Sequence, residues 1–247
     1  MIAICYGWNW QFQFEPGQGL LYNRRSSRAN RPYHDKCFPK EIFMAVLVGK
    51  QAPFFAGEKT FSAVLGDGQI VDNYSFQEAT AGKYAVVFFY PLDFTFVCPS
   101  ELIAFDHRLA EFKARNVEVI GVSIDSQFSH AAWRNTPVEK GGIGQVGYTL
   151  VADIQHELCK AFDVEADGGV AFRGSFLIDK AGVVQHQVVN NLPLGRNVDE
   201  MIRMVDALQF TEEHGEVCPA GWNKGKKGMT ASAEGVASYL AENAKDL

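Results

Sequence analysis

The sequence predicts an α/β protein in which one central β-sheet carries helices on its faces. Short apolar strands alternate with amphipathic segments from residue 44 onward, and residues 84–90 are an uninterrupted apolar run, as expected when both faces of a strand are covered. Apolar residues make up 47% of the 247-residue chain, which includes 19 Phe. This composition is sufficient for a packed core and argues against a disordered chain.

The first half of this pattern contains a hairpin, a buried strand and a long helix. Residues 61–65 and 69–71 flank a Gly-Asp-Gly turn, which predicts a β-hairpin. Residues 84–90 (YAVVFFY) predict a buried strand, which a proline ends. A helix is expected over residues 98–115, because its apolar residues are spaced 3, 4 and 3 apart on one face, at Leu102, Phe105, Leu109 and Phe112.

The second half continues the alternation and ends in a polar tail. The expected elements are, in order, a buried strand at 117–122, a helix across 130–134, a strand at 148–152, a short helix near 158, and a hairpin of 171–178 with 183–189. Asn197 or Asp199 can cap the next helix, whose apolar residues are Met201, Met204, Val205 and Leu208. The tail is polar and Gly-rich from Glu212, with a weak final helix near 232–244.

Three regions are expected: an extension at 1–43, an α/β domain at 44–205 and a C-terminal extension at 206–247. Residues 1–43 carry six basic and three acidic side chains, a net charge of +3, which leaves −9 for the rest. They lack helical periodicity, and we expect them to be disordered. We interpret them as an upstream extension, with Met44 as the natural start. A transit peptide is the second interpretation, because RRSSR is basic, and a secretory signal is disfavoured by the missing apolar region.

Charge and cysteine usage disfavour several classes of function. The formal charge of −6 argues against a nucleic-acid partner, and no apolar run approaches the roughly 20 residues that cross a bilayer. The five cysteines are far apart, without a CxxC motif and without a Cys or His pair at zinc-site spacing. We therefore expect no metal, no cofactor and no membrane partner, and a protein of the reducing cytoplasm.

One cysteine occupies a position that favours chemistry. Cys98 lies in PLDFTFVCPSE, between a buried strand and a helix, at the sheet edge where open α/β folds bind ligands. Pro99 suits the first helical position, so that the helix dipole and free N–H groups stabilise a thiolate, the nucleophilic form of Cys98. Most single cysteines are inert buried residues, but this position and the Thr95 hydroxyl favour a functional role. Glu101 is expected to organise the first helical turn rather than to perform chemistry.

The segment PLDFTFVCPSE resembles the active-site signature of the typical 2-Cys peroxiredoxins. The segments FRGSFLID, LPLGR and HGEVCPAGW match in the same order, so the resemblance covers the chain from about Met44 to its end. It is greatest to the eukaryotic-like branch, which includes many bacterial alkyl hydroperoxide reductases of the C type. The resemblance implies a thioredoxin-like fold, a central mixed sheet flanked by helices, with peroxiredoxin additions and a C-terminal extension.

The resemblance also implies a thiol peroxidase that reduces hydrogen peroxide and organic hydroperoxides. Cys98 corresponds to the peroxidatic cysteine, which becomes a sulfenic acid, and Cys218 corresponds to the resolving cysteine, supplied by the partner protomer. The intersubunit disulfide is then reduced by thioredoxin or a flavoprotein disulfide reductase. A homodimer, and a decamer built from such dimers, are implied as well. The other matching positions are Thr95, which holds the peroxide, Pro91, which shields the pocket, Arg173, which lies beside the thiolate, and Arg196, which supports it.

The residues alone give part of this scheme independent support. Breaking an O–O bond requires donors that stabilise the departing oxyanion, and a guanidinium supplies several. Arg173 lies in an apolar strand, where it either points inward to such a site or outward as a surface charge. Cys218 lies 120 residues beyond Cys98, and a thiol protects a sulfenic acid by forming a disulfide. The sequence leaves open whether Cys218 acts within one chain or between two.

Several other residues have structural interpretations. Gly141-Gly-Ile-Gly144 resembles the GGLG loop of overoxidation-sensitive peroxiredoxins, whereas Tyr239-Leu240 replaces their Tyr-Phe motif, so sensitivity stays open. Cys159 is expected to be a packed bystander, and Trp133 and Trp222 are expected to pack. Four histidines are interpreted as scattered and unpaired, at His107, His130, His156 and His186.

Three other functions compete with a peroxidase. An oligomeric holdase chaperone, or a redox-signalling protein in its overoxidised form, is the main alternative. A hydrolase using Cys98 and a distant His lacks a His-bearing signature, and Thr95 suits a peroxide better than an acyl group. A dithiol exchange protein is disfavoured because no CxxC motif occurs.

Overall fold

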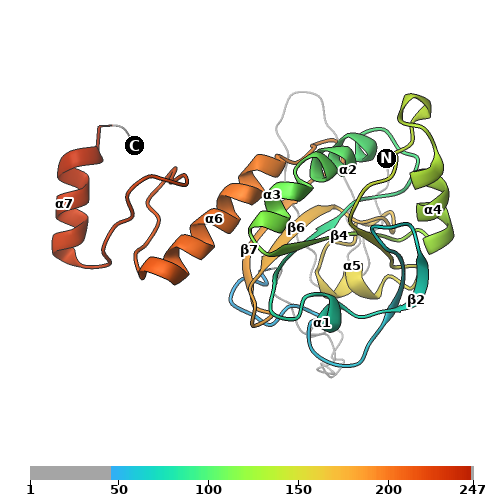
Figure 1. Ribbon diagram of the computed structural model, residues 1–247, viewed down its shortest axis with the longest axis horizontal. Helices are drawn as coiled ribbons and strands as arrows, with labels where there is room; N and C mark the ends of the chain where they lie inside the picture. Colours follow the sequence, from blue (N-terminus) through green and yellow to red (C-terminus); the bar gives the residue numbers. More distant parts are fainter. Residues whose placement is uncertain (1–45, 246–247) are drawn as a thin grey trace, which may run out of the picture. The chain divides into compact units, whose positions relative to one another are not determined.

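A seven-stranded mixed sheet lies at the centre of the protein, in the order β2-β1-β5-β4-β3-β6-β7 (Figure 1). The computed structural model describes residues 46–245, and the extension expected at 1–43 lies outside the described residues. Three neighbouring strands are parallel, namely β3 (Tyr84–Phe89), β4 (Val117–Ser123) and β5 (Thr149–Ala152). The antiparallel strands are β1 (Phe61–Val64), β2 (Ile70–Tyr74), β6 (Arg173–Ile178) and β7 (Val184–Asn190).

Alternate residues of the central strands contribute to two apolar cores, one on each face of the sheet. Phe88 of β3 packs in the core that includes α2 (Cys98–His107), α3 (Leu109–Ala114) and α6 (Val198–His214). Its neighbour Phe89 packs in the opposite core, with residues of α1 (Phe76–Ala79) and α5 (Glu157–Ala161). Both rings are fully buried, which contributes about 1.5–3 kcal/mol each. Figure 1 shows the two groups of helices on opposite sides of the sheet.

The helix expected over 98–115 is divided into α2 and α3. Arg108, between them, has φ −101° and ψ 1°, outside the helical region, and its guanidinium pairs with Asp199 at 2.7 Å. The four apolar residues that predicted one helix are nevertheless all buried on the same side. Their spacing therefore identified the buried face correctly, although it did not indicate the break at one residue.

The C-terminal part contains two capped helices. Asn197 caps α6, since its side chain accepts hydrogen bonds from the N–H groups of Asp199 and Glu200, at 3.0 and 3.3 Å. The helix continues to His214, into the segment expected to be a polar tail, and it crosses the boundary placed between residues 205 and 206. Ser232 caps α7 (Ala233–Asn243). Among the described residues, no helix combines the length and apolar character needed to cross a membrane.

The remaining elements follow the sequence pattern closely, with two additions. Helix α4 (Gln127–Asn135) begins after Ser126, whose hydroxyl accepts from Ser129 N. The sequence did not predict the short helix α1 or the single 3-10 turn at Val138–Lys140. Both are shorter than the two turns that a periodicity argument needs.

Candidate active site

Cys98 is the first residue of α2, and its side chain is fully buried. The loop before it begins at Pro91, a buried residue two positions after the end of β3. Thr95 Oγ1 lies 2.9 Å from Cys98 Sγ and 2.8 Å from the carbonyl oxygen of Leu92. The loop turns at Phe94, whose φ of 56° is left-handed. The expected helix N-terminus and the expected hydroxyl therefore meet at the Cys98 sulfur.

Arg173 reaches the same sulfur from the first position of β6. Its Nη1 lies 3.4 Å from Cys98 Sγ, and its Nε donates to the carbonyl of Leu192 at 2.7 Å. The side chain is 4% exposed, so the guanidinium points inward, which was one of the two orientations that the sequence allowed. A buried donor beside the sulfur can bind an oxyanion or a thiolate.

Glu101 connects Arg173 to a second buried arginine. Its Oε2 pairs with Arg173 Nη1 at 2.5 Å, and its Oε1 accepts from Arg196 Nε and Arg196 N, both at 2.9 Å. Glu101 lies in the first turn of α2, where a supporting role was expected for it, and its carboxylate spans these two arginines. Its direction is set by α2, which turns residue 101 away from solvent and into the core.

Arg196 is the most extensively hydrogen-bonded member of this cluster. Its Nη1 donates to the carbonyls of Phe89 and Gly174, at 2.7 and 2.8 Å, and its guanidinium carbon lies 5.1 Å from the centre of the Phe88 ring. Burial lowers the pKa of Arg196, whereas the Glu101 carboxylate raises it. The two guanidinium groups and one carboxylate carry one net positive charge, which a thiolate at Cys98 balances.

Cys218 lies in the segment that follows α6. Its Sγ contacts the carbonyl oxygen of Ala207 at 3.6 Å and Thr211 Oγ1 at 3.7 Å, both on α6. Arg203 holds the segment to the helix by donating to the carbonyl of Trp222 at 2.8 Å. Cys98 and Cys218 are both free thiols, and the structure does not bring these two expected partners together.

The interpretation of two histidines as unpaired is wrong. His130 Nδ1 lies 2.9 Å from Asp93 Oδ2, and both side chains are almost completely buried. His156 Nδ1 lies 2.5 Å from Glu165 Oε1. The sequence did contain a signal for the first pair, because Asp93 follows β3 and His130 follows β4, and parallel neighbours bring their carboxyl ends to one edge.

The other single residues pack as expected. Cys159 is buried in the core between the sheet and α5, where burial raises the pKa of its thiol. Trp133 is fully buried, and Trp222 is nearly so, with its ring 4.8 Å from that of Phe210. Within residues 46–245, no group of three or more side chains is arranged to hold a metal ion.

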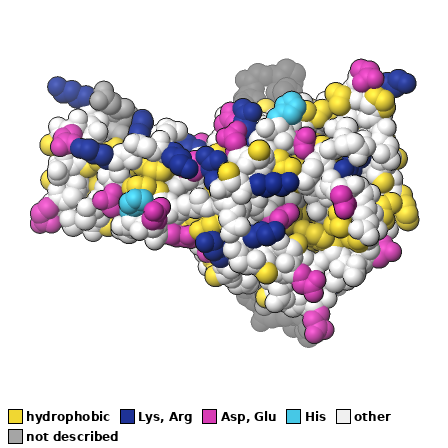
Figure 2. Space-filling view, viewed as in Figure 1, with side chains coloured by type: hydrophobic (Ala, Val, Ile, Leu, Met, Phe, Trp, Pro, Cys, Tyr) yellow, Lys and Arg dark blue, Asp and Glu magenta, His cyan; other side chains and the backbone are white. Residues whose placement is uncertain are grey.

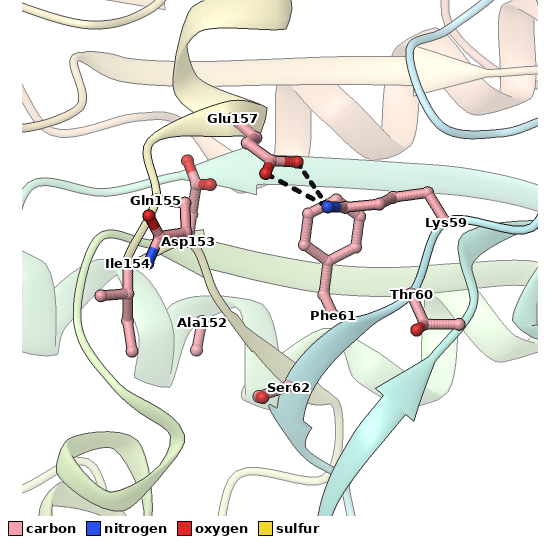
Figure 3. Close-up of a pocket in the computed structure, with 9 residues that line it drawn as sticks. All are labelled: Lys59, Thr60, Phe61, Ser62, Ala152, Asp153, Ile154, Gln155 and Glu157. Carbon is pink, nitrogen blue, oxygen red and sulfur yellow. Dashed lines mark hydrogen bonds and ion pairs between the residues drawn. The ribbon is translucent and has the colours of Figure 1, made fainter.

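A small pocket of about 210 Å³ lies between β1 and the loop after β5 (Figure 3). Lys59 and Glu157 form an ion pair at 2.8 Å on one side of it, and Asp153 lies on the other. The Asp153 carboxylate accepts from the backbone N–H groups of Leu158 and Cys159. The Asp153 carboxylate thus caps the N-terminus of α5. None of the residues that line the pocket belongs to the Cys98 site.

Comparisons with known proteins identify the family to which this chain is similar. The family model described as AhpC/TSA family matches residues 48–187, and the C-terminal domain of 1-Cys peroxiredoxin matches residues 207–242. Alkyl hydroperoxide reductase C of Helicobacter pylori is 54% identical over 80% of this chain and 98% of its own. Peroxiredoxin-2 of Bos taurus is 45% identical over 79% of this chain and 96% of its own.

A solved structure has the same fold as this chain. The reduced 2-Cys peroxiredoxin of Plasmodium vivax superposes with a TM-score of 0.75 at 48% identity, over 79% of this chain and 99% of its own. This confirms the expected thioredoxin-like peroxiredoxin fold. None of the relatives named here is described as a chaperone, a hydrolase or a dithiol exchange protein. The chain therefore belongs to the AhpC/TSA family of peroxiredoxins, and it is a thiol peroxidase.

Proposed function

We propose that Cys98 is the peroxidatic cysteine of a two-cysteine cycle that reduces hydrogen peroxide and organic hydroperoxides. The thiolate attacks the terminal oxygen of the peroxide, so that an S–O bond forms and the O–O bond breaks. The departing RO⁻ takes up a proton and leaves as an alcohol or as water, while Cys98 becomes a sulfenic acid. The observation that carries this proposal is the convergence of Thr95 Oγ1 and Arg173 Nη1 on one buried sulfur, at 2.9 and 3.4 Å.

The neighbouring residues divide the binding of the peroxide between them. Thr95 holds one peroxide oxygen through its hydroxyl, and Arg173 stabilises the thiolate and the negative charge that develops on the leaving oxygen. Arg196 and Glu101 orient Arg173 without contacting the peroxide, as their hydrogen bonds to each other indicate. Pro91 lacks an N–H group, and its buried ring excludes water from the loop.

Cys218 resolves the sulfenic acid in the second step. Its thiol attacks the Cys98 sulfur, an S–S bond forms, the S–O bond breaks, and water leaves. Because Cys98 is fully buried and Cys218 is docked on α6, the first turn of α2 and the Cys218 segment must both move before the sulfur atoms meet. The thiol comes from the partner protomer, and thioredoxin or a flavoprotein disulfide reductase then regenerates both thiols. Because the cycle needs reduced thiols, we assign it to the cytoplasm.

The proposed assembly is a homodimer, with a decamer built from such dimers. Strand β7 lies at the edge of the sheet and exposes Val188 and Val189, which suits pairing with a second copy. Three exposed aromatic side chains, 54%, 99% and 66% accessible, suit a second contact; they are Phe94, Phe96 and Phe128. Figure 2 shows hydrophobic side chains gathered at the edge of the molecule where Figure 1 has α4.

Steady-state turnover with thioredoxin tests this cycle. Cys98→Ser is expected to lose all peroxide reduction. Cys218→Ser is expected to consume one equivalent of peroxide and then stop, because no disulfide forms for thioredoxin to reduce. Cys159→Ser serves as the matched cysteine control and should turn over like the wild type. Sustained thioredoxin-dependent turnover by Cys218→Ser would contradict the two-cysteine cycle and indicate a single-cysteine mechanism.

A further inference from the structure

A buried polar group lies directly behind the loop that carries Thr95. Asp93 is its centre: Asp93 Oδ1 accepts from the Tyr90 hydroxyl at 2.9 Å, and Oδ2 lies 2.9 Å from His130 Nδ1 and 2.7 Å from Ser129 Oγ. The side chains of Asp93 and His130 are 1% and 0% exposed. Burying a carboxylate is costly unless it is paired and fully hydrogen-bonded. The Asp93 carboxylate is paired and hydrogen-bonded within this cluster. The cluster has no other role in the proposed cycle.

The partners of Asp93 in this group come from elements outside the loop. Tyr90 follows β3, and its hydroxyl remains a donor because burial and the Asp93 charge hold its pKa well above the usual value. His130 lies on α4, and its Nε2 faces the carbonyl of Val151 on β5 at 3.3 Å. Both ring nitrogens of His130 therefore face oxygen acceptors. The loop is thus fixed to α4 and to two strands of the sheet at a single residue, Asp93.

The same residue is fixed a second time through its backbone. The Asp93 N–H donates to Asp125 Oδ2 at 2.9 Å, and Asp125 follows β4. That N–H and the Leu92 carbonyl are the two ends of one planar peptide unit, so fixing one end fixes the direction of the other. The Leu92 carbonyl is the acceptor 2.8 Å from Thr95 Oγ1. The orientation of the peptide therefore determines where the Thr95 hydroxyl is held.

The Thr95 hydroxyl has a single proton and two possible acceptors. It can donate to the Leu92 carbonyl, or to Cys98 Sγ at 2.9 Å, but not to both at once. Moving the carbonyl by a fraction of an ångström changes this competition and shifts the oxygen away from the sulfur. A misplacement of about 1 Å can slow a positioned reaction by about a hundredfold.

We propose that Asp93 and His130 are positioning residues for the peroxidase reaction, which fix the Leu92–Asp93 peptide and thereby aim the Thr95 hydroxyl at the peroxide beside Cys98. This inference rests on the proposed role of Thr95 in holding the peroxide. Neither Asp93 nor His130 touches the reacting sulfur, and both act through the loop. Three contacts of 2.8 to 2.9 Å connect His130 to Cys98. His130 contacts the Asp93 carboxylate, and the Leu92–Asp93 peptide carries the carbonyl that contacts Thr95 Oγ1, which in turn contacts Cys98 Sγ.

A double-mutant cycle between His130 and Thr95 tests the proposal in the full-length protein. Two second-order rate constants are measured for Cys98, one with hydrogen peroxide and one with iodoacetamide, which needs the thiolate but no hydroxyl clamp. His130→Leu is expected to slow the peroxide reaction roughly tenfold to a hundredfold and to leave alkylation within about twofold. His130→Asn, which retains a donor near the Nδ1 position, should recover most of the loss. His107→Leu, an exposed histidine of α2, is the matched control and should change neither rate.

The effect of His130→Leu in the Thr95→Val background shows whether His130 acts by positioning the Thr95 hydroxyl or whether its loss disturbs the whole site. Because Thr95→Val removes the hydroxyl that is being aimed, adding His130→Leu should then slow the peroxide reaction no further, within about twofold. An equal loss in both backgrounds, or a parallel loss of alkylation, would overturn the proposal. If Thr95→Val alone leaves the peroxide rate unchanged, the proposed role of Thr95 is wrong instead. If His130→Leu fails to fold by circular dichroism, the same cycle is run with Ser129→Ala, which removes one donor to Asp93 and should give a smaller loss with the same dependence on Thr95.

Discussion

Replacing Glu101 by Gln removes the single negative charge between two buried guanidinium groups while preserving the shape of the side chain. The carboxylate accepts four hydrogen bonds, one from Arg173 and three from Arg196, at distances from 2.5 to 3.0 Å. Removing one partner of a buried ion pair costs about 3–5 kcal/mol, because the remaining charge stays desolvated and unpaired. At about 2–4 °C per kcal/mol for a chain of this size, the melting temperature should fall by about 6–20 °C.

The matched control for this substitution is Glu111→Gln. Glu111 is 51% exposed and pairs with Arg108 at 3.5 Å, and a pair of this kind contributes at most about 1 kcal/mol. Urea denaturation and thermal melts at one fixed protein concentration compare the two variants. If Glu101→Gln unfolds at the same midpoint as Glu111→Gln, then the Glu101 cluster does not stabilise the fold as a buried ion-pair network.

The same variant separates charge from geometry at Cys98. Glu101→Gln raises the net charge of the cluster by one, so the Cys98 thiolate is favoured and alkylation by iodoacetamide should not slow. The peroxide reaction should slow by about tenfold or more, equivalent to about 1.4 kcal/mol of transition-state stabilisation, because Arg173 loses the partner that orients it. Parallel slowing of both reactions would show that Glu101 serves the thiolate rather than the guanidinium.

Three further predictions concern other parts of the protein. Cys159 should resist iodoacetamide at pH 8 in the native protein, because burial raises the pKa of its thiol and keeps it protonated; mass spectrometry that finds Cys159 labelled as fast as Cys218 would refute this. Asn197→Ala should destabilise the protein by about 1 kcal/mol in urea through loss of the α6 cap, whereas an unchanged midpoint would show that the cap is dispensable. Phe96→Asp should shift sedimentation toward smaller species, since Phe96 is 99% exposed, and an unchanged sedimentation profile would exclude this surface from the assembly.

Local patterns were sufficient to predict the sheet and most helices. The apolar run at residues 84–90 identified β3 because a strand covered on both faces has no polar positions. The start of α6 was predicted at Asn197 or Asp199, because few side chains can satisfy the free N–H groups of a helix, and the structure has the cap at Asn197. The break at Arg108 was not predictable in this way. One residue with a non-helical backbone leaves the spacing of the buried residues unchanged.

The contacts of the site likewise include local ones, which the sequence predicts, and non-local ones, which it does not. Cys98 and Thr95 are three residues apart, so their contact follows from a loop that ends at a helix N-terminus. The pairing of Glu101 with Arg173 and Arg196 depends on three elements that meet only after the sheet has formed, and neither charge nor spacing specifies it. The contact of Asp93 with His130 is equally non-local, and it was missed although Asp93 follows β3 and His130 lies on the helix that follows the parallel neighbour β4.

The disulfide formed after one equivalent of hydrogen peroxide tests the central claim most directly. Reduced wild-type protein should become a disulfide-linked dimer on a non-reducing gel, and peptide mass spectrometry should find Cys98 joined to Cys218. The Cys218→Ser variant should remain monomeric on the same gel and carry a sulfenic acid on Cys98, trapped with dimedone. A wild-type protein that stays monomeric with both thiols free, or a disulfide that involves Cys159 instead, would contradict the assignment of Cys98 and Cys218.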